Sequence, residues 1–96
     1  MADPALLTES EIEELLVEHP GWSRGEDRLE RSYEFADFSE AFGFMTRVAM
    51  VAERLFHHPE WSNVWSKVSI AVSDHELGGI SSRDREFVER VDALDG

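Results

Sequence analysis

Residues 53–61 read ERLFHHPEW, and this stretch marks the point where a long helix must end. Pro59 cannot continue a helix, and it favours an extended conformation for His58. Glu53 precedes His57 by four residues, so the two side chains share one face of that helix. Two histidines are therefore expected at a helix C-terminus, whose partial negative charge favours imidazolium. Since histidine titrates near pH ~6.5, this is a candidate site for proton transfer.

A helical pattern leads into this stretch from Asp37, whose spacing to Glu40 is typical of a helix start. Apolar residues then recur at the i, i+3 and i+4 positions of one helix face as far as about Phe56. We expect this face to pack on a sheet. Its members are Phe38, Ala41, Phe42, Met45, Val48, Ala49, Ala52, Leu55 and Phe56.

A second apolar line lies off that face and consists of Phe44, Met50 and Val51. Scattered exposed apolar residues are common on protein surfaces. We favour a subunit interface instead, because a chain of 96 residues has only a small core and gains stability by association. A homodimer or homotetramer through the outer face of helix 38–56 is therefore expected.

After Pro59 the hydrophobic period changes from that of a helix to that of a strand. Residues 63–72 alternate between two faces and are rich in β-branched side chains. Alternation alone leaves open whether a turn near Ser66 divides this segment into two strands. A Gly-Gly loop follows at 78–79, and residues 81–84 read SSRD, a capping signal for a final helix. The expected buried stripe of that helix is Phe87, Val88, Val91 and Leu94.

The first third of the chain predicts a helix followed by a hairpin. Thr8 and Glu11 have the spacing of a capping box, and the helix that they begin stops near His19. Residues 21–35 are interpreted as two short strands joined by a turn. Trp22 could line a pocket, but packing in the core is the better interpretation.

The 96 residues suffice for one domain, 1–96, of which residues 1–7 are expected to be a frayed terminus. The chain has no cysteine, which excludes disulfides and thiolate chemistry. It has 21 acidic and 9 basic residues and a net charge of −12, which argues against direct binding of nucleic acid. No apolar run is long enough to span a membrane, so we expect a cytoplasmic location.

The acidity of the protein has two interpretations. A solvated, self-repelling surface is the simpler one. A cytoplasm of high salt concentration is the alternative, because dense carboxylates and scarce lysine keep a protein hydrated there. Thermal unfolding measured against KCl concentration distinguishes the two, since full stability at low salt would contradict the second.

His57, His58 and His75 are three of only four histidines in the chain, and His75 precedes the Gly-Gly loop, a common place to present a functional group. Three histidines can bind zinc, but adjacent histidines diverge and no HxH or HExxH spacing is present, so a metal site is disfavoured. A nucleophilic triad is disfavoured because no serine stands in an elbow motif. His19 is interpreted as a helix-end or surface residue.

The spacing of these residues carries a further signal. The order is Glu53, then His57-His58-Pro59, then Trp65, His75 and Asp84. This pattern resembles the signature of the pterin-4a-carbinolamine dehydratases. The flanking segments 41–49 and 59–65 resemble the most conserved segments of that family. The resemblance implies an α+β fold, in which three helices pack on one face of a four-stranded antiparallel sheet in the order α-β-β-α-β-β-α. It also implies that residues 63–72 belong to two strands.

The resemblance further implies an activity. These enzymes dehydrate 4a-hydroxytetrahydropterin to quinonoid dihydropterin, which recycles the cofactor of aromatic amino-acid hydroxylases. Imidazoles near neutral pH suit both of the proton transfers that this needs, and no metal, nucleotide or redox cofactor is implied. Carried over by motif position, His57, His58 and His75 are the expected catalytic residues, with one of the first two as general acid.

Four more residues are expected to bind the substrate, namely Glu53, Trp61, Ser73 and Asp84. Glu53 either fixes a histidine or binds the amino-pyrimidine edge of the pterin. Asp84 either only caps the last helix or fixes His75. Trp61 is expected to stack on the flat pterin ring, and Trp65 either does the same or packs in the core.

Two other functions stay open at this point. Some members of the family act as dimerisation cofactors of a homeodomain transcription factor, a role that would use the outer helix face around Phe44 and Met50. A pterin-binding role in molybdopterin metabolism would use the same pocket as the dehydratase. A hydroxylase-coupled assay separates the dehydratase from both.

Overall fold

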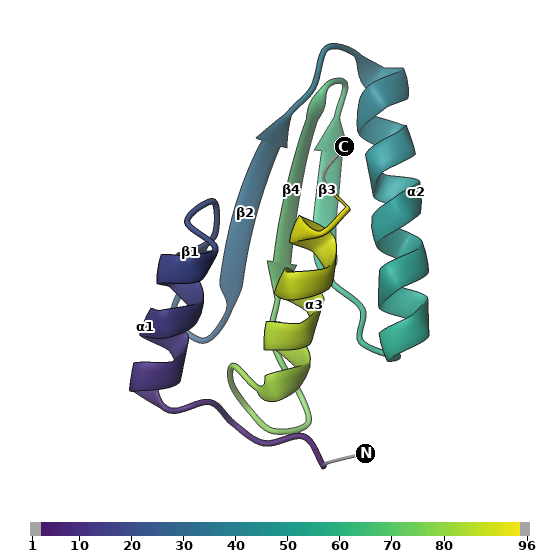
Figure 1. The fold of residues 1–96 in the computed structure, drawn as a ribbon. Coiled ribbons are helices and arrows are strands. Elements are labelled where there is room, and N and C mark those ends of the chain that lie inside the picture. The colour runs from purple at the N-terminus through teal and green to yellow at the C-terminus, as the bar shows by residue number, and fades with distance from the viewer. Residues whose placement is uncertain (1–2, 95–96) are drawn as a thin grey trace.

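Helices and strands follow one another in the order α-β-β-α-β-β-α, as the sequence predicted. The structure, a computed structural model, describes residues 3–94. Its four strands form one antiparallel sheet in the order β1-β2-β4-β3, and the three helices cover one face of this sheet (Figure 1). The elements are α1 (Glu9–Glu18), β1 (Ser23–Arg24), β2 (Leu29–Glu34), α2 (Phe38–Leu55), β3 (Glu60–Val64), β4 (Lys67–Val72) and α3 (Ser82–Asp92).

Strand β4 lies between β2 and β3, and its alternation directs three buried apolar side chains toward the core. Strands β3 and β4 are separate and are joined by a tight turn at Trp65 and Ser66, which answers the question that alternation left open. Trp65 has a left-handed φ of 51°. The side-chain amide of Asn63 steadies the turn by donating to the carbonyls of Trp65 at 3.1 Å and Lys67 at 2.9 Å. The three buried residues of β4 are Val68, Ile70 and Val72.

The hydrophobic core lies between the sheet and the helices. Trp22 is 3% exposed, its ring meets Phe87 edge-on at 6.5 Å, and its indole N–H donates to Asp92 at 3.0 Å. The interpretation of Trp22 as a core residue is therefore confirmed. Within residues 3–94, no helix is both long enough and apolar enough to cross a membrane. The helices contribute Ile12, Leu15, Ala41, Phe44, Val48, Ala52, Phe87, Val88 and Val91 to the core.

The rotation of α2 about its axis differs from the expected one. Phe44, expected on the outer face, is buried, and its ring centre lies 4.6 Å from that of Tyr33 and 5.2 Å from that of Phe35. Val51 is also partly buried, whereas Met50 is exposed as expected. Apolar residues occupy so much of this helix that two neighbouring faces satisfy the same spacing, and only packing selects one. The residues wrongly expected to be buried are Phe38, Phe42, Ala49 and Phe56.

The segment before α1 is held in place, so the expected frayed terminus of residues 1–7 does not extend to Leu7. The N–H of Ala5 donates to the hydroxyl of Ser82 at 3.1 Å, and the N–H of Leu7 donates to the carbonyl of Ile80 at 2.9 Å. These partners come from the far end of the chain, so no local sequence pattern predicted them. The first two residues lie outside the described part of the chain.

Candidate active site

Helix α2 ends in a left-handed residue, and that end sets the directions of two adjacent histidines. Phe56 has a φ of 51°, and the N–H of His57 donates to the carbonyl of Ala52 at 3.1 Å, as at a Schellman-type helix end. Pro59 then favours an extended chain. His57 turns inward and is 8% exposed, whereas the side chain of His58 is 60% exposed. The predicted helix end is confirmed, and it separates the two rings.

Asp84 is the partner of the buried histidine. His57 Nε2 lies 2.5 Å from Asp84 Oδ1, and Asp84 is completely buried. The other carboxylate oxygen, Oδ2, accepts the backbone N–H of Ser81 at 2.8 Å, which completes the capping box of α3. Asp84 therefore caps the helix, as one interpretation predicted. It also fixes a histidine, but that histidine is His57, and the expectation of a contact with His75 is wrong.

Glu53 contacts His58, the other histidine of the pair. Glu53 Oε1 lies 2.9 Å from His58 Nε2, and both side chains are largely exposed. Helical spacing predicted that Glu53 and His57 share a face, but the left-handed turn at Phe56 carries His57 inward and brings His58 toward the carboxylate. Because exposed ion pairs are weak, Glu53 guides the His58 ring without fixing it.

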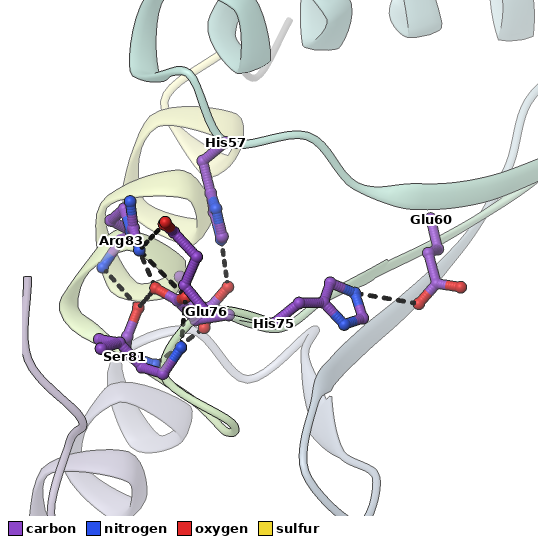
Figure 2. Close-up of polar contacts among 9 residues, drawn as sticks. His57, Glu60, His75, Glu76, Ser81 and Arg83 are labelled. Carbon is purple, nitrogen blue, oxygen red and sulfur yellow. Dashed lines mark hydrogen bonds and ion pairs between the residues drawn. The ribbon is translucent and has the colours of Figure 1, made fainter.

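His75 lies on the turn between β4 and α3, and its side chain is 81% exposed. His75 Nε2 lies 4.0 Å from Glu60 Oε1, beyond hydrogen-bond distance. Figure 2 shows the ring directed toward Glu60, which begins β3. The third histidine therefore reaches the site from a different part of the fold and is loosely held.

One hollow of about 210 Å³ brings the three histidines together. His57 and His58 line it from the end of α2, whereas His75 and Ser73 line it from the turn after β4. Arg83, in the first turn of α3, also lines it. The structure thus gathers four of the residues expected in the site around one space large enough to admit part of a small molecule.

The tryptophans expected beside the substrate lie elsewhere. Trp61 lines a larger hollow of about 430 Å³ at the sheet, together with Ser32, Ser62 and Ser69. The described lining of that hollow includes no histidine, so we place the candidate site at the smaller one. Trp65 lies on the turn between β3 and β4 and is 64% exposed, so the expectation that it packs in the core is wrong.

Two residues that the sequence did not single out, Asp74 and Arg83, form a partly buried ion pair that lines the hollow, with Arg83 Nε 2.8 Å from Asp74 Oδ2. Burial acts to raise the pKa of Asp74, but hydrogen bonds from Arg83, Ser81 and the Leu77 N–H, with the Arg83 charge, lower it to about 2. An acid directly before His75 was the available signal. A pairing across a turn has no fixed spacing, so the sequence did not reveal the partner.

Comparison with known proteins identifies the family. Residues 5–94 match the model of the pterin 4 alpha carbinolamine dehydratase family. A relative from Synechococcus sp. (strain WH7803), provisionally named a pterin-4-alpha-carbinolamine dehydratase, is 50% identical over 90 residues, which cover 94% of this chain and 97% of the relative. The chain belongs to the pterin 4 alpha carbinolamine dehydratase family. A relative from Prochlorococcus marinus (strain MIT 9312) with the same provisional name is 41% identical over 92 residues, which cover 96% of each chain.

Solved structures of pterin dehydratase relatives share the fold. A transcriptional coactivator/pterin dehydratase from Brucella melitensis superposes with a TM-score of 0.90 at 38% identity, covering 96% of this chain and 100% of the other. A pterin dehydratase-like protein identified as a RuBisCO assembly factor in the alpha-carboxysome gives a TM-score of 0.63 at 25% identity, covering 78% of this chain and 87% of the other. The fold and family that the sequence motif implied are confirmed.

In this member of the pterin 4 alpha carbinolamine dehydratase family, three imidazoles line the hollow. Within residues 3–94, no three His, Asp or Glu side chains gather closely enough to hold a metal ion. His57 has one ring nitrogen fixed by Asp84, and His75 lines the same hollow from the turn after β4. The arrangement is therefore suited to giving a proton to, and taking a proton from, one small molecule between them.

Proposed function

We propose that this protein is a hydro-lyase that converts 4a-hydroxytetrahydropterin to quinonoid dihydropterin and water. The observation that carries the proposal is the presence of three imidazoles around one hollow, in a chain that belongs to the pterin 4 alpha carbinolamine dehydratase family. An imidazole both gives and accepts a proton near neutral pH. The dehydration needs one proton given and one proton taken, so its demands match these side chains.

The reaction breaks a C–O and an N–H bond and forms an O–H bond and a new ring double bond, without a change of net oxidation state. The bond between C4a and the hydroxyl oxygen breaks with its electron pair on oxygen, which takes up a proton and leaves as water. A ring nitrogen loses its proton, and the electron pair of that N–H bond supplies the new double bond. The proton donated equals the proton removed, so we propose that no cofactor takes part. Each proton transfer contributes about 10²–10⁴-fold to such a rate.

We assign the two proton transfers to opposite sides of the hollow. His57 is the better candidate for the general acid, because Asp84 occupies Nε2 and leaves Nδ1 for the substrate. His58 stands beside it with Glu53 as its partner. His75, on the other side, orients the hydroxyl or removes the other proton. Ser73 lines the same hollow and offers a hydroxyl for hydrogen bonding to the pterin.

A hydroxylase-coupled assay tests the proposal. An aromatic amino-acid hydroxylase, which we propose as the functional partner, generates 4a-hydroxytetrahydropterin, and the formation of quinonoid dihydropterin is followed with and without the protein. We expect the protein to accelerate this step, and His57→Ala to reduce the acceleration about 10²-fold. Arg90→Gln, a surface change on α3, should keep the wild-type rate. A wild-type protein that leaves the background rate unchanged would contradict the proposal.

The outer face of α2 favours a second role, in binding protein. Phe38, Phe42 and Met50 are 50%, 55% and 62% exposed, and exposed apolar side chains gathered on one helix mark interaction surfaces. Of the two solved structures with this fold, the Brucella protein is named as a transcriptional coactivator and the carboxysome protein as a RuBisCO assembly factor. Both names describe roles in binding other proteins. We propose that this face joins copies of the chain into a homodimer or homotetramer. Phe42 is exposed on this face, whereas Phe44, which the sequence placed there, is buried.

Light scattering tests this second role. We expect the wild-type protein to have the mass of a dimer or tetramer, and Phe42→Glu to lower that mass, because a charge cannot be buried unpaired in an apolar interface. Val17→Glu is the matched control, since Val17 is 80% exposed on α1 and lies outside the proposed interface. A wild-type monomer would contradict the assembly without bearing on the dehydratase activity.

A further inference from the structure

The turn that carries His75 is closed on itself at Asp74. The N–H of Asp74 donates to the carbonyl of Gly79 at 2.7 Å, and the Asp74 carbonyl accepts the N–H groups of Gly78 at 2.7 Å and Gly79 at 3.2 Å. Gly78 has a φ of 76°, which residues with a side chain rarely adopt. These backbone bonds fix the shape of the turn, but its position relative to the helices depends on side chains.

The side chain of Asp74 provides that attachment. It is 2% exposed, and its Oδ2 accepts hydrogen bonds from Arg83 Nε at 2.8 Å and Ser81 Oγ at 2.7 Å. Its Oδ1 accepts from Arg83 Nη2 at 3.0 Å and from the Leu77 N–H at 3.1 Å. All four of these groups, two of which belong to Arg83, are donors. The surroundings therefore fit the ionised carboxylate and oppose a neutral amide in its place.

Arg83 holds the residues on both sides of His75. Besides its two bonds to Asp74, its Nη2 donates to Glu76 Oε1 at 2.8 Å. His75 therefore lies between two residues held by one guanidinium, while its own ring extends away from them (Figure 2). Because Arg83 belongs to the first turn of α3, this contact fixes the turn relative to that helix.

The same end of α3 also holds His57. The N–H of Ser81 donates to Asp84 Oδ2 at 2.8 Å, while the hydroxyl of Ser81 donates to Asp74. Asp84 Oδ1 in turn contacts His57 Nε2. One connected set of hydrogen bonds therefore runs from His57, through the start of α3, to Asp74 and Glu76 on the turn that carries His75 (Figure 2). The start of α3 sets both sides of the hollow.

We propose that Arg83 and Asp74 are positioning residues that hold His75 at the correct place opposite His57. The proposal rests on the proposed dehydratase function, because the relative position of the two histidines matters only when both meet one substrate. Neither Arg83 nor Asp74 needs to touch the reacting atoms for this. The pair Arg90–Glu86 serves as a contrast, because it joins two half-exposed side chains of one helix away from the hollow.

A double-mutant cycle between Arg83 and His75 separates positioning from general stabilisation. In the otherwise wild-type protein, we expect Arg83→Gln to lower kcat about tenfold with less than a twofold change in KM, because catalysis is sensitive to small misplacements. In the His75→Ala protein, the same substitution should lower kcat less than about twofold, since the group that Arg83 positions is absent. A purely structural role predicts equal losses in both proteins.

Further variants keep the test decisive if Arg83→Gln does not fold. Arg83→Lys keeps the charge but not the forked geometry, so we expect about a threefold loss of kcat in the wild-type background. In the His75→Ala background, Arg83→Lys should have no measurable effect. Arg90→Gln is the matched arginine control and should keep the wild-type kcat. Thermal melts followed by circular dichroism verify that each protein is folded at the assay temperature.

The outcomes are distinguishable. A smaller effect of the Arg83 substitutions in the His75→Ala background would support the positioning role. Equal losses in the two backgrounds, or a folded Arg83→Gln protein with wild-type kcat, would overturn the positioning role and leave the dehydratase function intact. A wild-type protein without dehydratase activity would overturn the proposed function and the positioning role together.

Discussion

The two sides of the hollow differ in how firmly their histidines are held. On the α2 side, His57 is 8% exposed, and its ring is fixed by the buried carboxylate of Asp84. On the β4 side, the ring of His75 is 81% exposed, and its neighbour Glu60 is 4.0 Å away. A buried, hydrogen-bonded ring keeps one orientation, whereas an exposed ring changes rotamer rapidly. One side therefore offers a preset geometry, and the other adapts to what enters the hollow.

The two sides also differ in what their buried carboxylates hold. Asp84 and Asp74 are both buried, and both bond to the start of α3 through Ser81. Asp84 fixes a histidine ring directly, whereas Asp74 fixes only the backbone next to His75. Both carboxylates are thus held by Ser81 at the start of α3, but only Asp84 bonds to a histidine ring.

The largest effect is expected when the α2 side of the hollow loses the carboxylate of Asp84. Asp84→Asn puts an amide NH2 group opposite either the Ser81 N–H or the His57 ring, and it leaves a buried donor unsatisfied. We expect the free energy of unfolding to fall by about 2 kcal/mol, as measured in urea. We also expect kcat to fall about 10²-fold, because His57 loses its orientation. Wild-type stability and rate in this variant would mean that Asp84 does not hold the ring.

Removing the His75 ring on the β4 side should lower activity without lowering stability. His75→Ala removes an exposed ring, so we expect the free energy of unfolding to change by less than about 0.5 kcal/mol. The loss of one proton-transfer group should still lower kcat about 10²-fold. Urea unfolding and steady-state kinetics on the same protein give both values. A marked loss of stability would show that His75 is held as firmly as His57.

Asp74 should make the free energy of unfolding of the protein depend on pH. Its folded-state pKa of about 2 lies below the ordinary value of 3.8, so the unfolded chain takes up the proton more readily. The stabilising contribution, about 2 kcal/mol, is therefore complete above pH ~5 and is lost as the pH falls through ~4 toward ~2. Urea unfolding of wild type and Asp74→Asn should show a stability difference that shrinks over this range. A difference independent of pH would contradict the ionised, hydrogen-bonded state of Asp74.

The smallest effect is expected at the exposed pair of the α2 side. Glu53→Gln removes the charge that faces His58, but both side chains are largely exposed. We expect no measurable change in stability and a change in kcat of less than about threefold. A loss as large as that of Asp84→Asn would mean that Glu53 binds the pterin directly, which is one of the two roles expected from the sequence.

Much of the fold was readable from the sequence because its signals are local. The capping residues Thr8, Asp37 and Ser81 each begin a helix as predicted, and Pro59 follows the predicted end of α2. The face of α2 that is buried was not readable, because Phe44 owes its burial to packing against β2. Side-chain contacts between distant elements decide such cases, and spacing within one helix does not.

The site was readable as a set of residues but not as a set of contacts. The motif named His57, His58 and His75, and Ser73 was expected to bind the substrate beside them. All four line one hollow, yet their roles in catalysis stay predictions. The partners of the first two histidines were not foreseen, because one left-handed residue at the end of α2 redirects both rings. The Asp74–Arg83 pair was missed for a related reason, since a turn brings the two residues together.

Single-turnover dehydration of synthetic 4a-hydroxytetrahydropterin tests the central claim most directly. The wild-type protein is compared with His57→Ala, His75→Ala and the variant that carries both changes, each shown to be folded. We expect the wild type to accelerate the reaction, each single variant to lose about 10²-fold of the acceleration, and the double variant to approach the uncatalysed rate. A folded double variant that dehydrates the pterin at the wild-type rate would contradict the assignment of this hollow as the active site.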